Sequence, residues 1–285
     1  MRNKVTVSLT GGLGNQMFQY SARRALSLRL SLPLLLDISW FRRRFNPNVM
    51  TSRMYELSVF PNLQNQDLVN RLPLPTAIQN IASLAKGEHI LHDTKISTVK
   101  FSSIQTRKHL RLTGYWQNVA YFESIRETLC SDFSLNYTSL QYANPELPQL
   151  DSGSTLGIHV RRGDYVSLPT TIGSNQTLDV TYYDNAIDLV MSRHKISKIV
   201  IVSDDVEWCQ RHFNGNIFII ASAENSSMED FAIFHTCDHH IISNSSFSWW
   251  AAWLKQEPDQ TVIAPTQWHP DGSGFKSIPN RWTAV

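Results

Sequence analysis

The sequence predicts an α/β protein in which parallel strands alternate with helices. Short runs rich in β-branched residues recur along the chain, and most of them are followed by stretches with apolar residues at helical spacing. Several runs end in polar residues, at the position where ligands bind in open parallel sheets. With 285 residues, the chain is long enough for one large domain or for two of moderate size.

The amino-terminal part predicts one strand, a glycine loop and a helix. The run KVTVSL, residues 4–9, is the expected strand, and apolar residues at helical spacing predict a helix over about residues 16–30. Gly12 and Gly14 have the spacing of a dinucleotide-binding fingerprint, but Met17 stands in the place of its third glycine. The glycines therefore predict that the backbone of this loop comes close to another group. A nicotinamide-dependent oxidoreductase stays an alternative function.

A linker is expected near the middle of the chain. Residues 40–112 are less regular and contain several prolines, and the polar stretch 136–154 contains two more. This composition predicts a first domain over residues 1–145 and a second over residues 151–285.

Five β-branched runs follow the linker in quick succession. A stretch with helical spacing over residues 179–193 separates the first two runs. The second half therefore predicts a doubly wound domain. The five runs are TLGIHV, KIVIVS, NIFIIAS, HHIIS and TVIAP.

Three of these runs lead into polar loops that would meet at one edge of a parallel sheet. GIHV is followed by Arg161 and Arg162, IVIVS by Asp204, and HIISN by Ser245 and Ser246. Arginine suits phosphate because its planar fork donates parallel hydrogen bonds and stays charged. Serines at the start of the following helix add free N–H groups for an anion. These residues predict a pocket for a nucleotide diphosphate. A carboxylate nearby can accept hydrogen bonds from the guanine ring.

The same residues allow other interpretations. The two arginines can instead pair with Asp164, Asp204 or Asp205 in a structural ion network. The tryptophans of WWAAWL, residues 249–254, are expected in the core of a helix rather than as a stacking platform.

The sequence predicts no metal site. Asp204 and Asp205 lack the Asp-x-Asp spacing that holds the cation of a nucleotide. The cluster from Cys237 to His240 has no second group of residues with ligand spacing. The three cysteines are odd in number and far apart, which favours a reducing compartment.

Charge and hydropathy set further limits. The net charge of +2 predicts no bulk attraction to nucleic acid. The start of the chain lacks the apolar stretch of a secretory signal. The leucine-rich run over residues 26–36 is too short to span a bilayer and is interrupted by Arg29 and Pro33. We therefore expect a soluble, cytoplasmic protein.

Four stretches taken together resemble the α-1,2-fucosyltransferases. GGLGNQMFQY, GYWQ, HVRRGDY and EDFAIFHTCDHHIISNSSFSWWAAWL follow one another in the order of that family, while residues 40–110 show no match. The resemblance implies a GT-B architecture, with two facing Rossmann-like domains and the active site in the cleft between them. It also implies GDP-fucose as the donor, transfer with inversion, and no obligatory metal or other cofactor.

The resemblance also implies roles for individual residues. Arg161 is expected on the β-phosphate of the donor with His159 beside it, and Asp230 is expected on the guanine. The glycine loop is expected to reach the donor from the first domain. The full set expected to bind the donor is Gly12, Gly14, Asn15, His159, Arg161, Arg162, Asp204, Asp230, Ser245, Ser246 and Phe247.

The expected acceptor is the 2-hydroxyl of a terminal β-galactoside. Tyr115 and Trp116, together with Tyr121, form either a platform for the galactose ring or part of the core. Asp164 is the nearest candidate for the base that takes the hydroxyl proton, although it can instead be an ion partner of the arginines. The lack of a membrane anchor favours bacterial synthesis of surface polysaccharide, such as O-antigen, or of an oligosaccharide.

The stretch WFRRRF, residues 40–45, combines aromatic rings with three arginines. It is either a solvated loop or a peripheral contact with a membrane surface or with the phosphate of a lipid-linked acceptor. Two further functions compete with fucosyl transfer: a transferase that uses another sugar nucleotide, and a sugar-nucleotide-binding protein without turnover.

Overall fold

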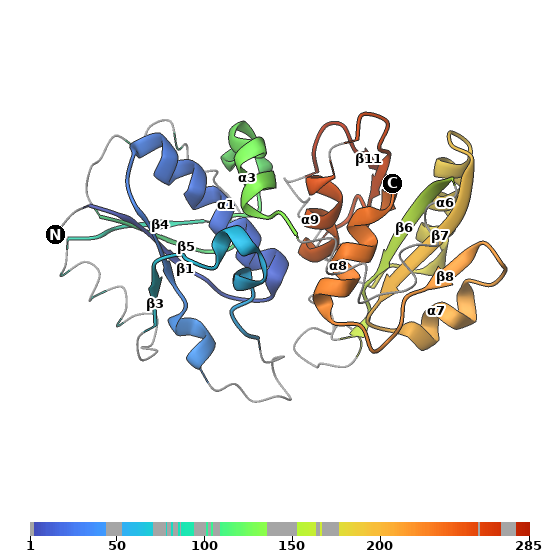
Figure 1. The fold of residues 1–285 in the computed structure, drawn as a ribbon, viewed down its shortest axis with the longest axis horizontal. Coiled ribbons are helices and arrows are strands. Elements are labelled where there is room, and N and C mark those ends of the chain that lie inside the picture. Colours follow the sequence, from blue (N-terminus) through green and yellow to red (C-terminus); the bar gives the residue numbers. More distant parts are fainter. Residues whose placement is uncertain are drawn as a thin grey trace. The chain divides into compact units, whose positions relative to one another are not determined.

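The computed structural model shows two compact units, of which the first ends at Ser134 and the second begins at Leu135 (Figure 1). Each unit contains one parallel sheet with helices packed on it. The structure describes residues 3–43, 53–70, 78, 81, 85, 87–93, 101, 104, 109–135, 153–163, 166, 177–255, 257–268 and 278–285.

The first unit contains a five-stranded parallel sheet with the strand order β3-β2-β1-β5-β4. The strand expected over residues 4–9 is confirmed as β1, which lies at the centre of this sheet. The strands are β1 (Val5–Ser8), β2 (Leu34–Asp37), β3 (Leu68–Val69), β4 (His89–His92) and β5 (Leu110–Thr113). The described helices are α1 (Leu13–Leu30), α3 (Arg126–Asp132) and short 3-10 helices over Ser39–Arg42, Leu57–Val59, Pro61–Leu63, Val119–Tyr121 and Glu123–Ile125.

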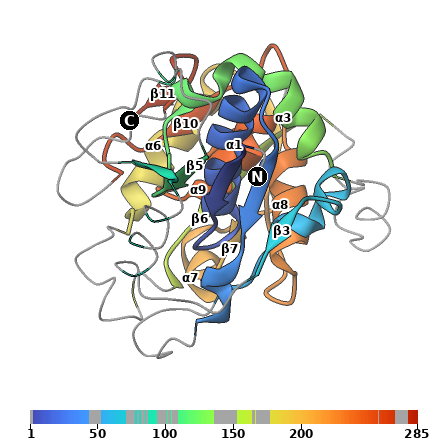
Figure 2. The ribbon, with the colours of Figure 1, turned by 90° about the vertical axis from the view of Figure 1, so that its left-hand side faces the viewer.

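The predicted amino-terminal helix is confirmed as α1, which starts at Leu13 rather than near residue 16. It starts early because Gly12 is the N-cap in an extended conformation, and because the carboxylate of Glu56 accepts a hydrogen bond from the Leu13 amide. α1 packs along the strands of the first unit (Figure 2). It ends where Ser31 adopts a left-handed conformation and donates its N–H to the last turn.

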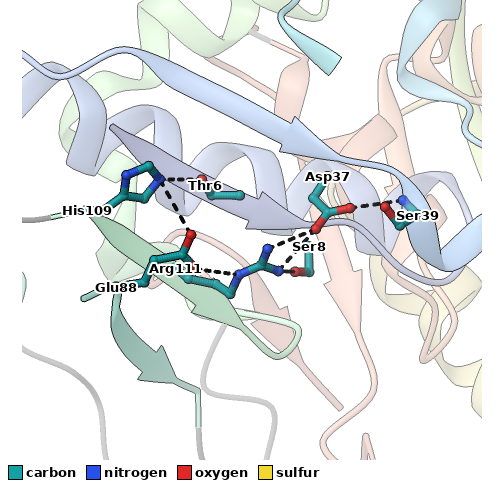
Figure 3. A network of polar contacts seen from close by, with 7 residues as sticks. All are labelled: Thr6, Ser8, Asp37, Ser39, Glu88, His109 and Arg111. Atoms are coloured by element: carbon teal, nitrogen blue, oxygen red, sulfur yellow. Dashed lines mark hydrogen bonds and ion pairs between the residues drawn. The ribbon is translucent and has the colours of Figure 1, made fainter. Parts of the chain in front are cut away.

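The two faces of the first sheet differ in polarity. Val5 and Val7 of β1 are fully buried, as are the leucines in register with Val7 on the neighbouring strands. Alternate residues of a strand point to opposite faces, so Thr6 and Ser8 lie on the other face. There Thr6 is in register with Arg111 of β5, and Ser8 with Asp37 of β2 (Figure 3). One face of the sheet therefore carries a buried polar network.

The Arg111 guanidinium is the centre of this network (Figure 3). It donates two hydrogen bonds to one carboxylate oxygen of Asp37, both at 3.1 Å, and one to the Ser8 hydroxyl at 2.7 Å. Its Nε donates to Glu88 at 3.2 Å. Arg111 and Asp37 are both buried, so each charge depends on the other for its hydrogen bonds. The network therefore connects β1, β2 and β5 to one another and to Glu88, the residue before β4.

The second unit contains a six-stranded parallel sheet with the strand order β11-β10-β9-β6-β7-β8. Each of the five runs predicted after the linker contains a strand, and β11 is a strand that the sequence did not predict. The strands are β6 (Ser154–Val160), β7 (Ile196–Ser203), β8 (Phe218–Ile220), β9 (His239–Ile241), β10 (Val262–Ala264) and β11 (Thr283–Ala284). The described helices are α6 (Val180–Met191), α7 (Val206–His212), α8 (Ser227–Thr236) and α9 (Ser246–Leu254).

The order of the second sheet reverses between β6 and β9. From β6 the chain adds β7 and β8 on one side, and it then returns to the other side of β6 for β9, β10 and β11. α6 and α7 pack on one face of the sheet, and α8 and α9 pack on the other (Figure 1). The predicted doubly wound arrangement is therefore confirmed, and its topological switch point lies between β6 and β9.

The packing of α8 requires a small residue in β6. A Cβ on Gly157 would lie 3.1 Å from the Phe234 ring and 3.2 Å from Cys237. The residues on either side, Leu156 and Ile158, point to the opposite face and join the core under α6 and α7. Gly157 thus lets α8 approach the strand that leads to the arginines.

Among the residues that the structure describes, none of the helices is both long enough and apolar enough to cross a bilayer.

We predict that Arg111→Met lowers the free energy of unfolding by about 3–5 kcal/mol, because it leaves the buried Asp37 carboxylate and the half-buried Glu88 carboxylate without their arginine partner. Urea unfolding followed by circular dichroism measures this loss. The matched control is Arg29→Met, which removes an exposed arginine of α1 and should change stability by about 0.5 kcal/mol or less. Equal losses for both variants would contradict the assigned role of the network.

Candidate active site

The carboxyl ends of β9, β6 and β7 lie next to one another at the switch point of the second sheet. The loop after β6 carries Arg161 and Arg162, and the loop after β7 carries Asp204 and Asp205. The loop after β9 leads into α9 at Ser246. The structure therefore brings the three predicted polar loops to one edge, which is where the parallel-sheet rule places a ligand.

His159 joins the two strands on either side of the switch point. Its Nδ1 lies 2.7 Å from the hydroxyl of Ser243, which follows β9. Its ring also contacts Phe247, with the ring centroids 5.5 Å apart. The pKa of His159 is lowered to about 3, mainly by burial; the charge of Asp204 opposes this effect and the charge of Arg161 adds to it. His159 is therefore a neutral hydrogen-bonding group at this edge and not a cation.

Both arginines pair with carboxylates at the end of β7. Nη1 of Arg161 lies 2.6 Å from Oδ2 of Asp204, and Nε of Arg162 donates to Asp205 at 3.1 Å. The backbone N–H of Arg162 also donates to Asp204 at 2.8 Å. The ion network that the sequence left open is thus present in the structure, and a phosphate ligand at Arg161 would share that arginine with Asp204.

The two arginines have different surroundings. The Arg162 guanidinium lies over the ring of Trp208 on α7, 4.5 Å from its centroid, which adds a cation–π contact to its ion pair. That packing favours a structural role for Arg162. Arg161, which pairs with Asp204, stays the predicted contact of a phosphate ligand.

Gly163 gives the Asp204 carboxylate its space. A Cβ on Gly163 would lie 2.7 Å from Oδ2 of Asp204, the atom that meets Arg161. Any larger residue would therefore push the carboxylate away from the arginine. Sequence reasoning missed this role, because it depends on the neighbouring strand and not on local spacing.

The start of α8 holds Asp230 in a half-buried position. Ser226 and Glu229 form a reciprocal capping box, which fixes the first turn of the helix. The Asn225 amide donates to the Asp230 carboxylate at 3.2 Å. Burial raises the pKa of Asp230 to about 6, and the charges of Glu229 and Asp204 act in the same direction. Asn225 is a neighbour of this site that sequence reasoning did not find.

The start of α9 offers backbone N–H groups at the switch point. Ser245 is the N-cap in an extended conformation, its side chain does not cap the helix, and the first turn contains no acidic residue. Ser246 and Phe247 are half-buried there, and the Phe247 ring packs against Phe231 of α8. The positive end of the helix dipole therefore faces the edge where Arg161 lies. Trp249, Trp250 and Trp253 are completely or almost completely buried, which confirms that they belong to the helix core.

The glycine loop of the first unit is held by amide side chains. Gln19 accepts a hydrogen bond from the Thr10 amide and donates one to its hydroxyl. Gln16 donates to the Gly11 and Met54 carbonyls and accepts from the Glu56 amide, all at 2.8–2.9 Å. Asn15, one of the predicted donor contacts, accepts from Gln117 at 2.8 Å.

The predicted glycines of this loop have different environments. Gly14 lies inside the first turn of α1 and is buried. A Cβ on Gly12 would lie 3.7–3.8 Å from three atoms of the Arg53 guanidinium. Arg53 was not found from the sequence, because it lies in the stretch that matched no motif.

The two aromatic residues predicted to bind the acceptor differ in their exposure to solvent. Trp116 is fully buried and packs on Phe101 and Tyr121. This favours core packing over a platform for Trp116, since a buried ring offers no face to a sugar. Tyr115 is 51% exposed and can meet a ligand.

Some predicted residues lie outside the described part of the chain. They are Asp164, the candidate base, and residues 44–45 of WFRRRF. Within the described residues, no group of three or more His, Cys, Asp or Glu side chains is arranged to hold a metal ion.

The family model described as glycosyl transferase family 11 matches residues 1–278. The chain belongs to glycosyltransferase family 11. The resemblance inferred from the four motifs is confirmed at the level of the family. The match covers both units, so both belong to one glycosyltransferase.

Curated relatives of this family 11 chain support the same grouping. The O-antigen biosynthesis glycosyltransferase WbnK of Escherichia coli is 28% identical over 96% of this chain and 98% of its own. An alpha-1,2-colitosyltransferase of Escherichia coli is 29% identical over 99% of this chain and 98% of its own. The galactoside 2-alpha-L-fucosyltransferase SEC1 of Bos taurus is 27% identical over 87% of this chain and 64% of its own.

Solved structures confirm the expected GT-B fold of this glycosyltransferase. POFUT1 in complex with GDP-fucose has a TM-score of 0.55, with 11% identity over 92% of this chain and 98% of its own. The fucosyltransferase NodZ from Bradyrhizobium has a TM-score of 0.51, with 11% identity over 88% of this chain and 92% of its own. At such identities the likeness establishes the fold alone.

We predict that acid destabilises the folded glycosyltransferase through its buried histidines. Burial lowers the pKa of His240 to about 3 and that of His235 to about 4, as it does for His159. An unfolded histidine titrates near pH 6.5, so their stabilising contribution is complete above that pH and is lost as the pH falls toward the folded pKa values. Each histidine should remove about 1.4 kcal/mol per pH unit in that range.

Urea unfolding at several pH values between 7.5 and 5 tests this, with His240→Gln as the comparison. The variant should show a shallower pH dependence, whatever its stability at neutral pH. Identical slopes for the variant and the wild type would contradict the assignment of His240 as a buried neutral group.

Proposed function

We propose that this enzyme transfers L-fucose from GDP-fucose to the 2-hydroxyl of a terminal β-galactoside, with inversion and without a metal ion. The observation that carries the proposal is the edge of the second sheet, where Arg161, aligned by Asp204, lies in the loop after β6, next to the loop that leads into α9. The names of the relatives point to α-1,2 transfer of fucose or of colitose, and to galactoside acceptors.

The proposed leaving group is the β-phosphate of GDP. The bond between the anomeric carbon and the β-phosphate oxygen breaks, and its electron pair leaves as negative charge on that phosphate. Arg161 is a fixed cation for this charge, and its ion pair with Asp204 holds the guanidinium in one orientation before the donor binds. Ser245, Ser246 and the N–H groups at the start of α9 add donors of fixed position. These groups can stabilise the negative charge on the leaving phosphate, as a metal ion would.

The proposed partner of the guanine is Asp230. An ionised carboxylate accepts two hydrogen bonds from the N–H groups on the Watson–Crick edge of guanine, and Asn225 orients this carboxylate. Adenine offers no such pair of donors. The glycine loop residues Gly12, Gly14 and Asn15 stay proposed contacts of the sugar portion of the donor.

The acceptor side is proposed to lie in the first unit. Tyr115, with its exposed ring, is the residue that we assign to the galactose. The acceptor hydroxyl attacks the anomeric carbon from the face opposite the phosphate and gives its proton to a base, for which Asp164 is the candidate from sequence. The likeness to WbnK supports an O-antigen acceptor, and we propose a lipid-linked oligosaccharide at the cytoplasmic side of the membrane.

Colitose is a second candidate for the sugar that is transferred, because one of the relatives is a colitosyltransferase that matches almost the whole chain. The same diphosphate pocket would serve both GDP-sugars. A donor panel with GDP-fucose and GDP-colitose separates them by the mass of the product.

We predict transfer of fucose from GDP-fucose to a β-galactoside such as lactose in the presence of EDTA, detected by product mass. Arg161→Ala should lower kcat by about 10²–10³-fold, because it removes a fixed donor to the leaving group. The matched variant Arg162→Ala should lower the melting temperature more than it lowers kcat, because Arg162 packs on Trp208. Activity that disappears with EDTA, or equal kcat losses for the two variants, would overturn the proposed chemistry.

We predict that GDP binding weakens as the pH falls below about 6, the pKa of Asp230. The ionised carboxylate accepts the guanine N–H groups and the protonated one does not, so affinity is highest above this pH and is lost on acidification. Isothermal calorimetry at pH 7.5 and 5 measures the change, and Asp230→Asn should bind GDP more weakly and without this pH dependence. If ADP binds as tightly as GDP, Asp230 does not select the base.

A further inference from the structure

The turn after β5 has a strained backbone. Gly114 has φ of 105° and Trp116 has φ of 58°, so two residues of this short segment lie in the left-handed region. That region suits glycine but is unfavourable for a bulky aromatic residue, because the Cβ crowds the following carbonyl. A buried tryptophan keeps this conformation only when its surroundings hold it there, and such strain concentrates where side chains must be placed for function.

Asp93, which follows β4, holds the turn. Its carboxylate accepts a hydrogen bond from the Trp116 N–H at 2.7 Å, and its own N–H donates to the Thr113 carbonyl at 3.0 Å. The indole N–H of Trp116 donates to the same carbonyl at 2.9 Å. A Cβ on Gly114 would lie 2.8 Å from the Asp93 Cβ. Asp93 and the turn are therefore packed so closely that only glycine fits at the point of contact.

A buried cation lies beneath the turn. The Arg23 side chain of α1 is fully buried, with its guanidinium 5.8 Å from the centroid of the Trp116 ring. Its Nη1 donates to the Gln19 carbonyl, while Nε and Nη2 have no hydrogen-bond partner within the part of the chain that the structure describes. Burial lowers the pKa of Arg23, and the negative charge of Asp93 opposes this effect. The Asp93 carboxylate therefore stabilises the turn directly and also stabilises the charge on which the indole rests.

The strained turn directs two side chains. Tyr115, between the two left-handed residues, is exposed over half of its surface. Gln117, on the other side of Trp116, donates to Asn15 in the first turn of α1, directly after the glycine loop, at 2.8 Å. The backbone conformation of Trp116 thus sets the position of the exposed ring relative to the glycine loop.

We propose that Asp93 and Trp116 are positioning residues for the transfer reaction, because they hold the turn that places Tyr115 against the acceptor sugar and Gln117 on the glycine loop. The inference rests on the proposed function of the enzyme. Neither residue is assigned a contact with the acceptor. Their effect on the acceptor is transmitted through Tyr115, so it should appear in the acceptor KM rather than in the affinity for GDP, which lacks the sugar that the glycine loop is proposed to contact.

The test is steady-state kinetics of Asp93→Ala, Asp93→Asn and a control, with GDP binding measured on each. Asp93→Ala removes the acceptor of the Trp116 N–H, and kcat/KM for the galactoside should fall by at least about tenfold, mainly through KM. GDP affinity should stay within about twofold, because the residues proposed to bind the nucleotide portion of the donor lie in the second unit, and the glycine loop is proposed to contact only the sugar. Asp93→Asn keeps an oxygen for the Trp116 N–H and should restore kcat/KM to within about threefold of the wild type.

The matched control is Asp132→Ala. Asp132 is another carboxylate of the first unit, and it accepts hydrogen bonds from the Tyr20 hydroxyl at 2.8 Å and from Arg24 at 2.9 Å. Its removal should lower the melting temperature and leave the acceptor KM within about twofold. An acceptor KM that is unchanged in Asp93→Ala, or changed no more than in the control, would overturn the proposal.

Two further outcomes are separable in the same assay. If Asp93→Ala does not fold, Trp116→Phe replaces it as the test, because it keeps a ring in the core but loses the bond to the Thr113 carbonyl. That variant should show the same rise in acceptor KM, and a wild-type value would overturn the inference. If the wild type itself transfers no sugar from a GDP-sugar, the proposed function fails, and the positioning role that rests on it fails with it.

Discussion

Parallel strands end at the same edge of their sheet, and this constraint determines where chemistry can occur in each unit. The strands of the second unit are short and mostly buried, so their polar groups appear only where the strands stop. The order of strands then decides which loops become neighbours. Because β9 returns beside β6, the arginines after one strand lie next to the serines after the other, although more than 80 residues separate them in the chain.

The pairing of arginines with aspartates at this edge has two consequences for the enzyme. Two adjacent cations without partners would repel each other and would lose orientation in solvent. Asp204 and Asp205 balance the charge and fix the guanidinium groups, and Gly163 keeps the space that Asp204 needs. In the proposed function the same ion pair orients Arg161 toward the phosphate of the donor, so a structural and a functional role of these contacts are compatible. Arg162 also packs on Trp208, which supports a structural role for this arginine.

The first unit uses buried polar side chains for a different purpose, which is to fix loops. Arg111 joins three strands, Gln16 joins the glycine loop to the segment at Met54, and Asp93 holds the turn at Trp116. Each of these groups is costly to bury and is stabilised by several hydrogen bonds at once. Such contacts allow little adjustment, because any displacement leaves a buried donor or acceptor unpaired. Loops held in this way keep one geometry, which suits a reaction in which an acceptor hydroxyl must be aligned with one carbon atom.

The sequence by itself determined the α/β class, the central strand and first helix of the first unit, five strands of the second unit, the tryptophan core of α9 and the family. These features follow from periodic apolar patterns and from short motifs, which act over a few residues. The tertiary structure alone decided that His159 is neutral, that Asp204 meets Arg161, and that Trp116 is core while Tyr115 is exposed. It also revealed Asn225 beside Asp230, Arg53 at the glycine loop and Asp93 beneath the strained turn. Each of these features depends on burial or on contact between elements that are distant in the chain. A local sequence pattern contains no information on either, because desolvation and long-range pairing exist only once the sheets have formed.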